Sequence, residues 1–189
     1  MKIKFWLLDI TYDVLPGNIP EIRMWGITPE GLRVAVLDRS FRPYFYAMPR
    51  EGSDIEKIAE KIRRMFPSKI IKTEVVEKKL LGKPVKVIKV TCQIPPQVPD
   101  LRERIKQLPD IVDVYEADIR FYMRYMIDND IYPSSWNIVD AEEIEKPTKW
   151  TVNKVYLAKS PPKTIPDGYP PDLRILAFDI ECYLSLIHI

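Results

Sequence analysis

The chain has 189 residues, of which 46% are hydrophobic and 30% charged, so it holds enough apolar side chains to bury a core of ordinary domain size. Its formal net charge of +2 excludes binding of nucleic acid through an overall basic field, so any such contact must come from local patches. Its two cysteines, Cys92 and Cys182, show no metal-ligand spacing, and no apolar stretch approaches the ~20 residues of a membrane span, so we expect a cytoplasmic protein with no membrane partner.

Three strand-like segments open the chain. They are apolar runs at residues 3–10, 21–27 and 32–38. Turn residues such as Pro16-Gly17-Asn18 separate them, which favours short connections between neighbouring strands. The sequence therefore predicts a small antiparallel sheet here.

Four more strands and two helices are expected next. The first helix should span 53–66, because Ser53 and Glu56 form a capping box and apolar residues then recur at helical spacing. The second should span 98–108, before a proline. The order β-α-β-β-α-β predicts a ferredoxin-like unit, the topology of RNA-recognition modules, and hence an α+β fold class. The strands of this unit are expected at residues 43–48, 70–77, 85–92 and 111–115.

The composition changes after this unit. An apolar-rich helix at about 119–127 closes it, and residues 131–172 are then rich in proline. This segment retains Trp136 and Trp150, which a purely disordered segment would not. We therefore expect an extended connector with one or two short strands, the best candidate being 150–157.

Two carboxylates end the last strand-like segment. The run Ile175–Phe178 predicts a buried strand, and the i, i+2 spacing of Asp179 and Glu181 places both on one face of it. Such a pair repels unless a cation lies between its members, and hard oxygen ligands suit Mg²⁺ or Mn²⁺, the ions of two-metal phosphoryl chemistry. On spacing alone, two solvated acids at a strand end are the commoner alternative.

Residues 176–181 resemble the first exonuclease motif of the family B DNA polymerases. Blocks upstream resemble the N-terminal domain of archaeal members of that family, in the expected order, at residues 41–44, 76–84, 111–116 and 124–128. The resemblance implies a DNA-directed DNA polymerase with a 3′→5′ proofreading exonuclease. Its partners would be single-stranded template DNA and primer–template DNA, with a sliding clamp as a further candidate.

The resemblance also implies a division of the chain. Residues 1–130 would form a template-sensing domain, 131–172 the connector, and 173–183 the first strand of an RNase H-like exonuclease domain. In that domain Asp179 and Glu181 are the expected catalytic and metal-binding residues, holding Mg²⁺ or Mn²⁺. Because the other carboxylates of such a nuclease are not expected among these residues, we expect this chain by itself to be inactive.

Archaeal members of the family carry a pocket that captures uracil in template DNA. Prolines and aliphatic side chains suit a narrow, dry slot that disfavours the extra methyl group of thymine. The alternative is that the apolar members are ordinary core residues and that Arg124 pairs with an acid. Pro96 also stands where relatives can carry a polar residue, which puts the capture in doubt. Mapped by the flanking motifs, the pocket residues are Tyr12, Pro43, Tyr44, Pro95, Val98, Ile119, Phe121 and Arg124.

Two other functions remain open. A free-standing RNA-recognition module would stack bases on aromatic side chains of its inner strands, but the strand at 85–90 has none. A stand-alone DEDD-type 3′→5′ exonuclease would share Asp179 and Glu181 but would not need the polymerase-like blocks. A local basic cluster is either a solvated face or a phosphate contact, and consists of Lys78, Lys79, Lys83, Lys86 and Lys89.

The last six residues match no continuation expected of the family. Residues 184–189 translate the DNA string CTG TCT CTT ATA CAC ATC, which resembles a transposase mosaic end used to tag sequencing libraries. We therefore hypothesise that they are a sequencing-adapter artefact, with a genuine short tail as the alternative. A native stop codon directly after Ile189 in the source DNA would exclude the artefact.

Overall fold

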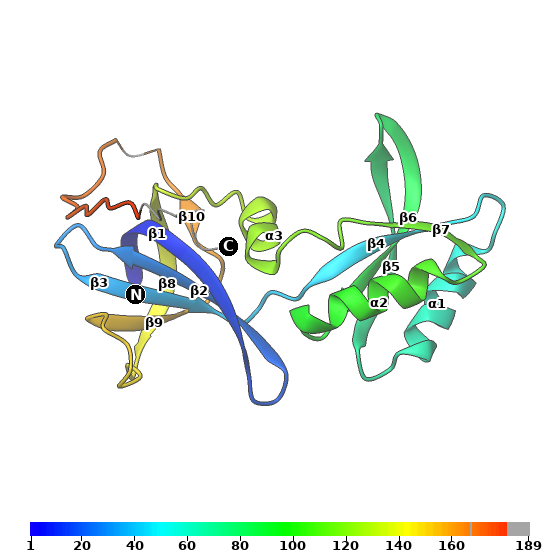
Figure 1. Cartoon of the computed structure of the whole chain (residues 1–189), viewed down its shortest axis with the longest axis horizontal. Helices are drawn as coiled ribbons and strands as arrows, with labels where there is room; N and C mark the ends of the chain where they lie inside the picture. The colour runs from blue at the N-terminus through cyan, green and yellow to red at the C-terminus, as the bar shows by residue number, and fades with distance from the viewer. Residues whose placement is uncertain (167, 181–189) are drawn as a thin grey trace, which may run out of the picture.

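The first of two sheets combines strands that are far apart in the chain. Its six strands are β1 (Lys2–Leu15), β2 (Ile19–Ile27), β3 (Arg33–Asp38), β8 (Trp136–Ile144), β9 (Lys154–Ala158) and β10 (Lys163–Thr164). In the computed structural model, which describes residues 1–166 and 168–180, they are ordered β1-β2-β3-β9-β8-β10 (Figure 1). Because β1 also pairs with β8, the sheet closes on itself. The pairs are antiparallel, except that β3 and β9 run parallel.

The first core lies inside this closed sheet. Alternate residues of β1, β2 and β3 point inward, with one shift at a bulge between Leu7 and Asp9 of β1. The helix α3 (Phe121–Asp128) covers the opening with Phe121 and Tyr125. A glycine is required at position 26 on β2, because a Cβ atom there would lie 2.7 Å from the ring of Phe5. The inward positions of the three strands include Phe5, Leu7, Ile22, Met24, Val34 and Val36.

The second sheet belongs to one continuous stretch of chain. Its strands are β4 (Tyr44–Pro49), β5 (Ile70–Leu80), β6 (Lys83–Cys92) and β7 (Ile111–Tyr115), ordered β5-β6-β4-β7 with every pair antiparallel. One face is covered by α1 (Ile55–Met65) and α2 (Val98–Lys106), which a 3₁₀ turn, η1 (Pro95–Gln97), precedes (Figure 1). The second core lies between this face and the helices. Among the described residues, no helix combines the length and apolarity that crossing a bilayer requires.

Most predicted elements are present, and the mixed α+β class is confirmed. The capping box predicted for the first helix is wrong in detail. Asp54 is the N-cap, and its carboxylate accepts a hydrogen bond from the N–H of Lys57 at 3.2 Å. Ser53 instead donates its hydroxyl to the carbonyl of Arg50, in the turn before the helix. Either side chain can satisfy a free N–H group, and the backbone turn at residues 50–53 decides which one reaches it.

Residues 136–164 contain more strand than the sequence indicated. The predicted strand at 150–157 corresponds to β9, whereas β8 was not predicted. β8 pairs with β1 from Lys2↔Asp140 to Trp6↔Trp136, so it is held by a partner more than a hundred residues away. Pairing of this kind outweighs the weak strand propensity of a segment rich in acidic residues.

Residues 168–180 form no strand, so the strand predicted at Ile175–Phe178 is not present in this structure. Ile175, Leu176 and Phe178 are 84%, 85% and 79% exposed. A strand requires neighbours for its backbone hydrogen bonds, and none of the described residues pairs with this segment. Glu181, Cys182 and residues 184–189, on which other predictions fell, lie outside the described residues.

Candidate functional site

We call the six-stranded sheet with α3 the first lobe, and the four-stranded sheet with α1 and α2 the second lobe. A cavity of about 440 Å³ lies where the two lobes meet. Its walls come from β1, from the start of β4, from η1 and the start of α2, and from the segment that enters α3. The structure therefore brings together four segments that are remote in sequence. All eight residues predicted for the pocket line it, namely Tyr12, Pro43, Tyr44, Pro95, Val98, Ile119, Phe121 and Arg124.

The apolar walls of the cavity are anchored in both cores. Phe121 is 6% exposed and belongs to the first core, and Val98 is 8% exposed and belongs to the second. The ring of Tyr12 packs edge-on against Phe121, with centroids 5.4 Å apart. The core role that the sequence left open as an alternative is therefore real for Phe121 and Val98, and it makes their positions in the cavity wall rigid.

Arg124 is a buried cation in the cavity wall, 7% exposed. It forms an ion pair with Glu116 through Nη2, and its Nη1 lies 3.6 Å from Oδ1 of Asp128. Burial alone would lower the pKa of Arg124, but the hydrogen bond to Glu116 and nearby negative charges outweigh it and raise that pKa. Pairing with an acid, the alternative in the sequence analysis, is thus what the structure shows. Its Nε is nevertheless buried, with no hydrogen-bond partner among the described residues.

Tyr44 lies beside Arg124 and is fixed from several sides. Its hydroxyl donates to Oδ2 of Asp128 at 2.6 Å, and the guanidinium carbon of Arg124 lies 5.0 Å from its ring centroid. Burial, followed by the hydrogen bond to Asp128, raises the pKa of Tyr44 far above its ordinary value. The phenol therefore stays protonated and keeps its hydrogen bond at any physiological pH.

The sequence prediction missed five further lining residues, which are Pro99, Ala117, Asp118, Arg120 and Tyr122. Four of these alternate with or adjoin residues 119 and 121, and that proximity was the available signal. Arg120 donates to the hydroxyl of Tyr122 at 3.1 Å and has no carboxylate partner among the described residues. The cavity rim therefore carries a cation whose charge is not neutralised by a neighbouring acid.

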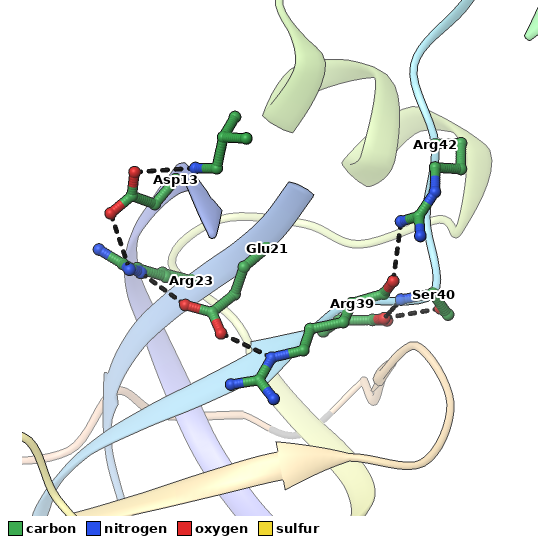
Figure 2. Close-up of polar contacts among 8 residues, drawn as sticks. Asp13, Glu21, Arg23, Arg39, Ser40 and Arg42 are labelled. Carbon is green, nitrogen blue, oxygen red and sulfur yellow. Dashed lines mark hydrogen bonds and ion pairs between the residues drawn. The ribbon is translucent and has the colours of Figure 1, made fainter. Parts of the chain in front are cut away.

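A polar network fixes the chain just before the cavity (Figure 2). Glu21, only 2% exposed, accepts from Nε of Arg23 and from Nε of Arg39, both at 2.8 Å. Arg42 donates to the carbonyl of Arg39 at 3.0 Å. These contacts hold the end of β3 and the link to Pro43, so they determine where the cavity wall begins. The sequence analysis did not identify Glu21, because a glutamate in a strand is normally solvent-exposed.

The cavity has the features of a binding site rather than of a reaction centre. Apolar walls surround a few fixed polar groups, as in sites that bind small molecules. Within residues 1–166 and 168–180, no group of three His, Cys, Asp or Glu side chains could hold a metal ion. Asp179 is exposed, and among the described residues its Oδ1 accepts only from the N–H of Ile180, at 2.8 Å. One described carboxylate does not make a metal site, so we derive no catalytic step from it.

The sequence and the structure of the chain are both similar to those of known proteins. The sequence profile of "DNA polymerase family B, exonuclease domain" matches residues 112–185. The structure is similar to that of the family B DNA polymerase of the archaeon Pyrobaculum calidifontis, with a TM-score of 0.77, 40% identity, and coverage of 90% of this chain and 21% of that one. The chain belongs to the family B DNA polymerases. The matched residues include Asp179 and Glu181.

Archaeal DNA polymerases match between about two thirds and nearly all of the chain. "DNA polymerase 2" of Aeropyrum pernix is 35% identical over 97% of this chain, and "DNA polymerase 1" of Pyrococcus abyssi is 43% identical over 69% of it. The chain spans 24% and 17% of the length of these two relatives. The similarity of the Aeropyrum pernix polymerase to this chain therefore covers both lobes and the cavity between them.

Proposed function

We propose that this chain is the template-sensing region of an archaeal family B DNA polymerase and that its cavity captures uracil from single-stranded template DNA. The observation that supports this most is that all eight residues mapped onto the family's pocket line one cavity. Its volume of about 440 Å³ falls within the range of about 300–1,000 Å³ that small-molecule sites occupy.

The walls suit a base without a methyl group. Val98 and Phe121, each anchored in a core, cannot move apart to admit extra volume without disturbing packing on both sides. Exclusion of one methyl group contributes about 1–3 kcal/mol of discrimination, so sterics alone favour uracil over thymine roughly 10- to 200-fold. Pro96 does not line the cavity, which weakens the concern that this proline alters capture.

The two arginines that line the cavity, Arg124 and Arg120, are proposed to have different roles. Arg124 is already paired with Glu116 and packs against the ring of Tyr44, and its Nε is buried away from the cavity, so we assign Arg124 to holding the cavity wall in place rather than to contacting the base. Arg120 lies at the rim and has no acidic partner in the described part of the chain, so it is better placed than Arg124 to contact a phosphate of the same nucleotide. Such a phosphate contact positions the strand and carries no sequence information.

The test compares binding of fluorescent single-stranded DNA containing one uracil with the same strand containing thymine. We expect tighter binding of the uracil strand by the native chain and loss of that preference in Val98→Gln, which extends a polar side chain into the cavity. Val112→Gln is the matched control, because Val112 is 55% exposed on β7, outside the cavity. Equal binding of both strands by the folded native chain would overturn the proposal.

The complete polymerase is proposed to extend primers and to remove mismatched 3′ ends. In that exonuclease, Asp179 and Glu181 would help to hold Mg²⁺ or Mn²⁺, which activate water and stabilise the leaving 3′ oxygen. The match of residues 112–185 to the exonuclease domain supports this role. The chain by itself is proposed to catalyse neither reaction. A zero rate of 3′-end removal with Mn²⁺ is the expected result, and a rate abolished by Asp179→Ala would contradict it.

The remaining assignments follow from the same membership. We propose a ferredoxin-like unit for residues 44–115, on the element order and strand order given above. A boundary between residues 172 and 173, the primer–template DNA and sliding-clamp partners, and a cytoplasmic location are proposed together with it. The expected boundary between 1–130 and 131–172 is not proposed again, because β8 and β9 pair with β1 and β3 in the first sheet. A stand-alone exonuclease or RNA module is disfavoured, because the relatives matched over both lobes are DNA polymerases.

A further inference from the structure

The second sheet has one face that no helix covers, and we call it the open face. Tyr44 and Tyr46 of β4 lie on it with Val87 of β6, whereas Phe45 and Ala47 point to the helices on the other side. Tyr115 of β7, Val76 and Val85 also pack there. The inner strand β4 therefore supplies the aromatic side chains that the sequence analysis looked for on β6.

Four lysines lie over this face, of which Lys72 is paired with Glu74, and we call the other three the lysine row. Residues directly opposite in an antiparallel pair share a face, so the pairings Lys78↔Val85, Leu80↔Lys83 and Glu74↔Lys89 place Lys78, Lys83 and Lys89 on the open side. The ammonium of Lys89 lies 3.9 Å from the ring centroid of Tyr44, and that of Lys78 lies 5.1 Å from the ring of Tyr46. These contacts hold the two cations against the sheet.

The charge of the lysine row is not neutralised. Glu74 on the same face is paired with Lys72 at 2.7 Å, and Asp113 of β7 with Lys106 at 2.9 Å. Within the described part of the chain, no carboxylate lies within ion-pair distance of Lys78, Lys83 or Lys89. Residues 70–92 hold six lysines against two glutamates, in a chain whose net charge is only +2. Positive charge is thus concentrated on this hairpin, which projects beyond the helices in Figure 1.

The open face is continuous with the cavity. Tyr44 lines the cavity and also carries Lys89 over its ring, so one side chain belongs to both surfaces. A polyanion whose base enters the cavity would meet the lysine row next. We propose that the open face binds the phosphodiester backbone of single-stranded DNA, with the lysine row contacting successive phosphates. The direction of the strand from the cavity rests on the function proposed above, whereas the backbone contact does not.

The charge complementarity favours nucleic acid as the occupant. Phosphates exchange condensed counterions for lysine ammonium groups, which gives a favourable and strongly salt-dependent contribution to binding. The aromatic floor beneath the lysines provides stacking surfaces for neighbouring bases if the lysine side chains swing outward to the phosphates. The competing explanation is that lysines on the edge strand β5 and its neighbour β6 prevent pairing with another chain.

The experiment measures the affinity for a thymine strand and a uracil strand at several salt concentrations. The variant replaces the three lysines of the row by glutamine, as Lys78→Gln, Lys83→Gln and Lys89→Gln. The control removes the same charge from exposed lysines of the first lobe that have no acidic partner in the described residues, as Lys149→Gln, Lys159→Gln and Lys163→Gln. Thermal unfolding and light scattering check that both variants are folded and monomeric.

We expect the lysine-row variant to bind both strands roughly 10- to 100-fold more weakly at low salt. The slope of log affinity against log salt should fall by about 2, since each phosphate contact of a single strand contributes about 0.7. The control variant should keep most of the native slope. An unchanged slope, an equal loss in the control, or self-association without loss of DNA binding would overturn the proposal.

The outcome is separable from that of the uracil test. If the lysine-row variant loses affinity but keeps the native uracil-to-thymine ratio, both proposals stand. If that ratio is one in the native chain while the slope still falls in the variant, uracil capture fails and the backbone contact stands.

Discussion

Replacement of Glu21 by glutamine tests whether the buried network before the cavity stabilises the fold. Glu21 is 2% exposed and accepts two hydrogen bonds of 2.8 Å, from Arg23 and Arg39. The amide of Glu21→Gln has the same size but no charge, and its NH₂ group would face a guanidinium donor. Breaking a fully buried ion pair costs about 3–5 kcal/mol.

The exposure of the partners reduces this cost. The Arg39 side chain is 40% exposed and can turn to water, and Arg23 keeps its ion pair with Asp13 at 2.8 Å. We therefore expect Glu21→Gln to lower the free energy of unfolding by about 2–3 kcal/mol, close to the value of one hydrogen bond to a charged group. For a chain of this length, that corresponds to a decrease of about 4–12 °C in Tm.

The assay is thermal unfolding followed by circular dichroism, with Glu143→Gln as the matched control. Glu143 pairs with Lys154 at 2.9 Å in the same lobe, but the two side chains are 46% and 40% exposed. An exposed pair contributes only about 0–1 kcal/mol, so the control should shift Tm by at most a few degrees. Equal shifts for the two variants, or no shift for Glu21→Gln, would refute the reasoning that burial makes this pair stabilising.

Two further predictions concern protonation and capping. Burial raises the pKa of both Tyr44 and Tyr125 far above that of an ordinary tyrosine, so in an alkaline titration of phenolate absorbance we expect both to ionise only as the chain unfolds. Their contribution to the free energy of unfolding is complete below about pH 10 and is lost as the pH rises above it. Normal ionisation of all tyrosines in the folded chain would contradict this prediction. We also expect Asp54→Ala to lower Tm more than Ser53→Ala, because Asp54 caps α1, and the reverse order would restore the predicted capping box.

Helices and strands could be predicted where their own residues determine them, and could not be predicted where a partner distant in sequence determines them. The second lobe was read from the sequence to within a few residues, because each of its strands and helices shows its own apolar period. β8 was missed, since its strand state depends on pairing with β1. The apolar run Ile175–Phe178 shows the converse, because a strand-like sequence forms no strand where the described residues offer it no partner.

The cavity could not have been predicted from residue patterns alone. Its walls come from positions between Tyr12 and Arg124, and no spacing rule connects them. They were grouped only through the resemblance of the surrounding blocks to a family. The lysines of the β5–β6 hairpin were visible as a basic cluster, but their sorting into two faces and the placement of Lys89 over Tyr44 required the register of the strands.

The closed sheet of the first lobe has a consequence for how the chain folds during synthesis. Strands β1–β3 leave the ribosome before the second lobe, yet two of their neighbours, β8 and β9, follow only after residue 135. The second lobe lies entirely within this interval, and even its most distant strand partners, such as Tyr46 and Tyr115, are closer in sequence than Trp6 and Trp136 of the first sheet. Loop-closure entropy therefore opposes its assembly less. We expect residues 44–115 to acquire structure while strands β1 and β3 still have unpaired edges. The incomplete first sheet is therefore the folding intermediate most vulnerable to association with other chains.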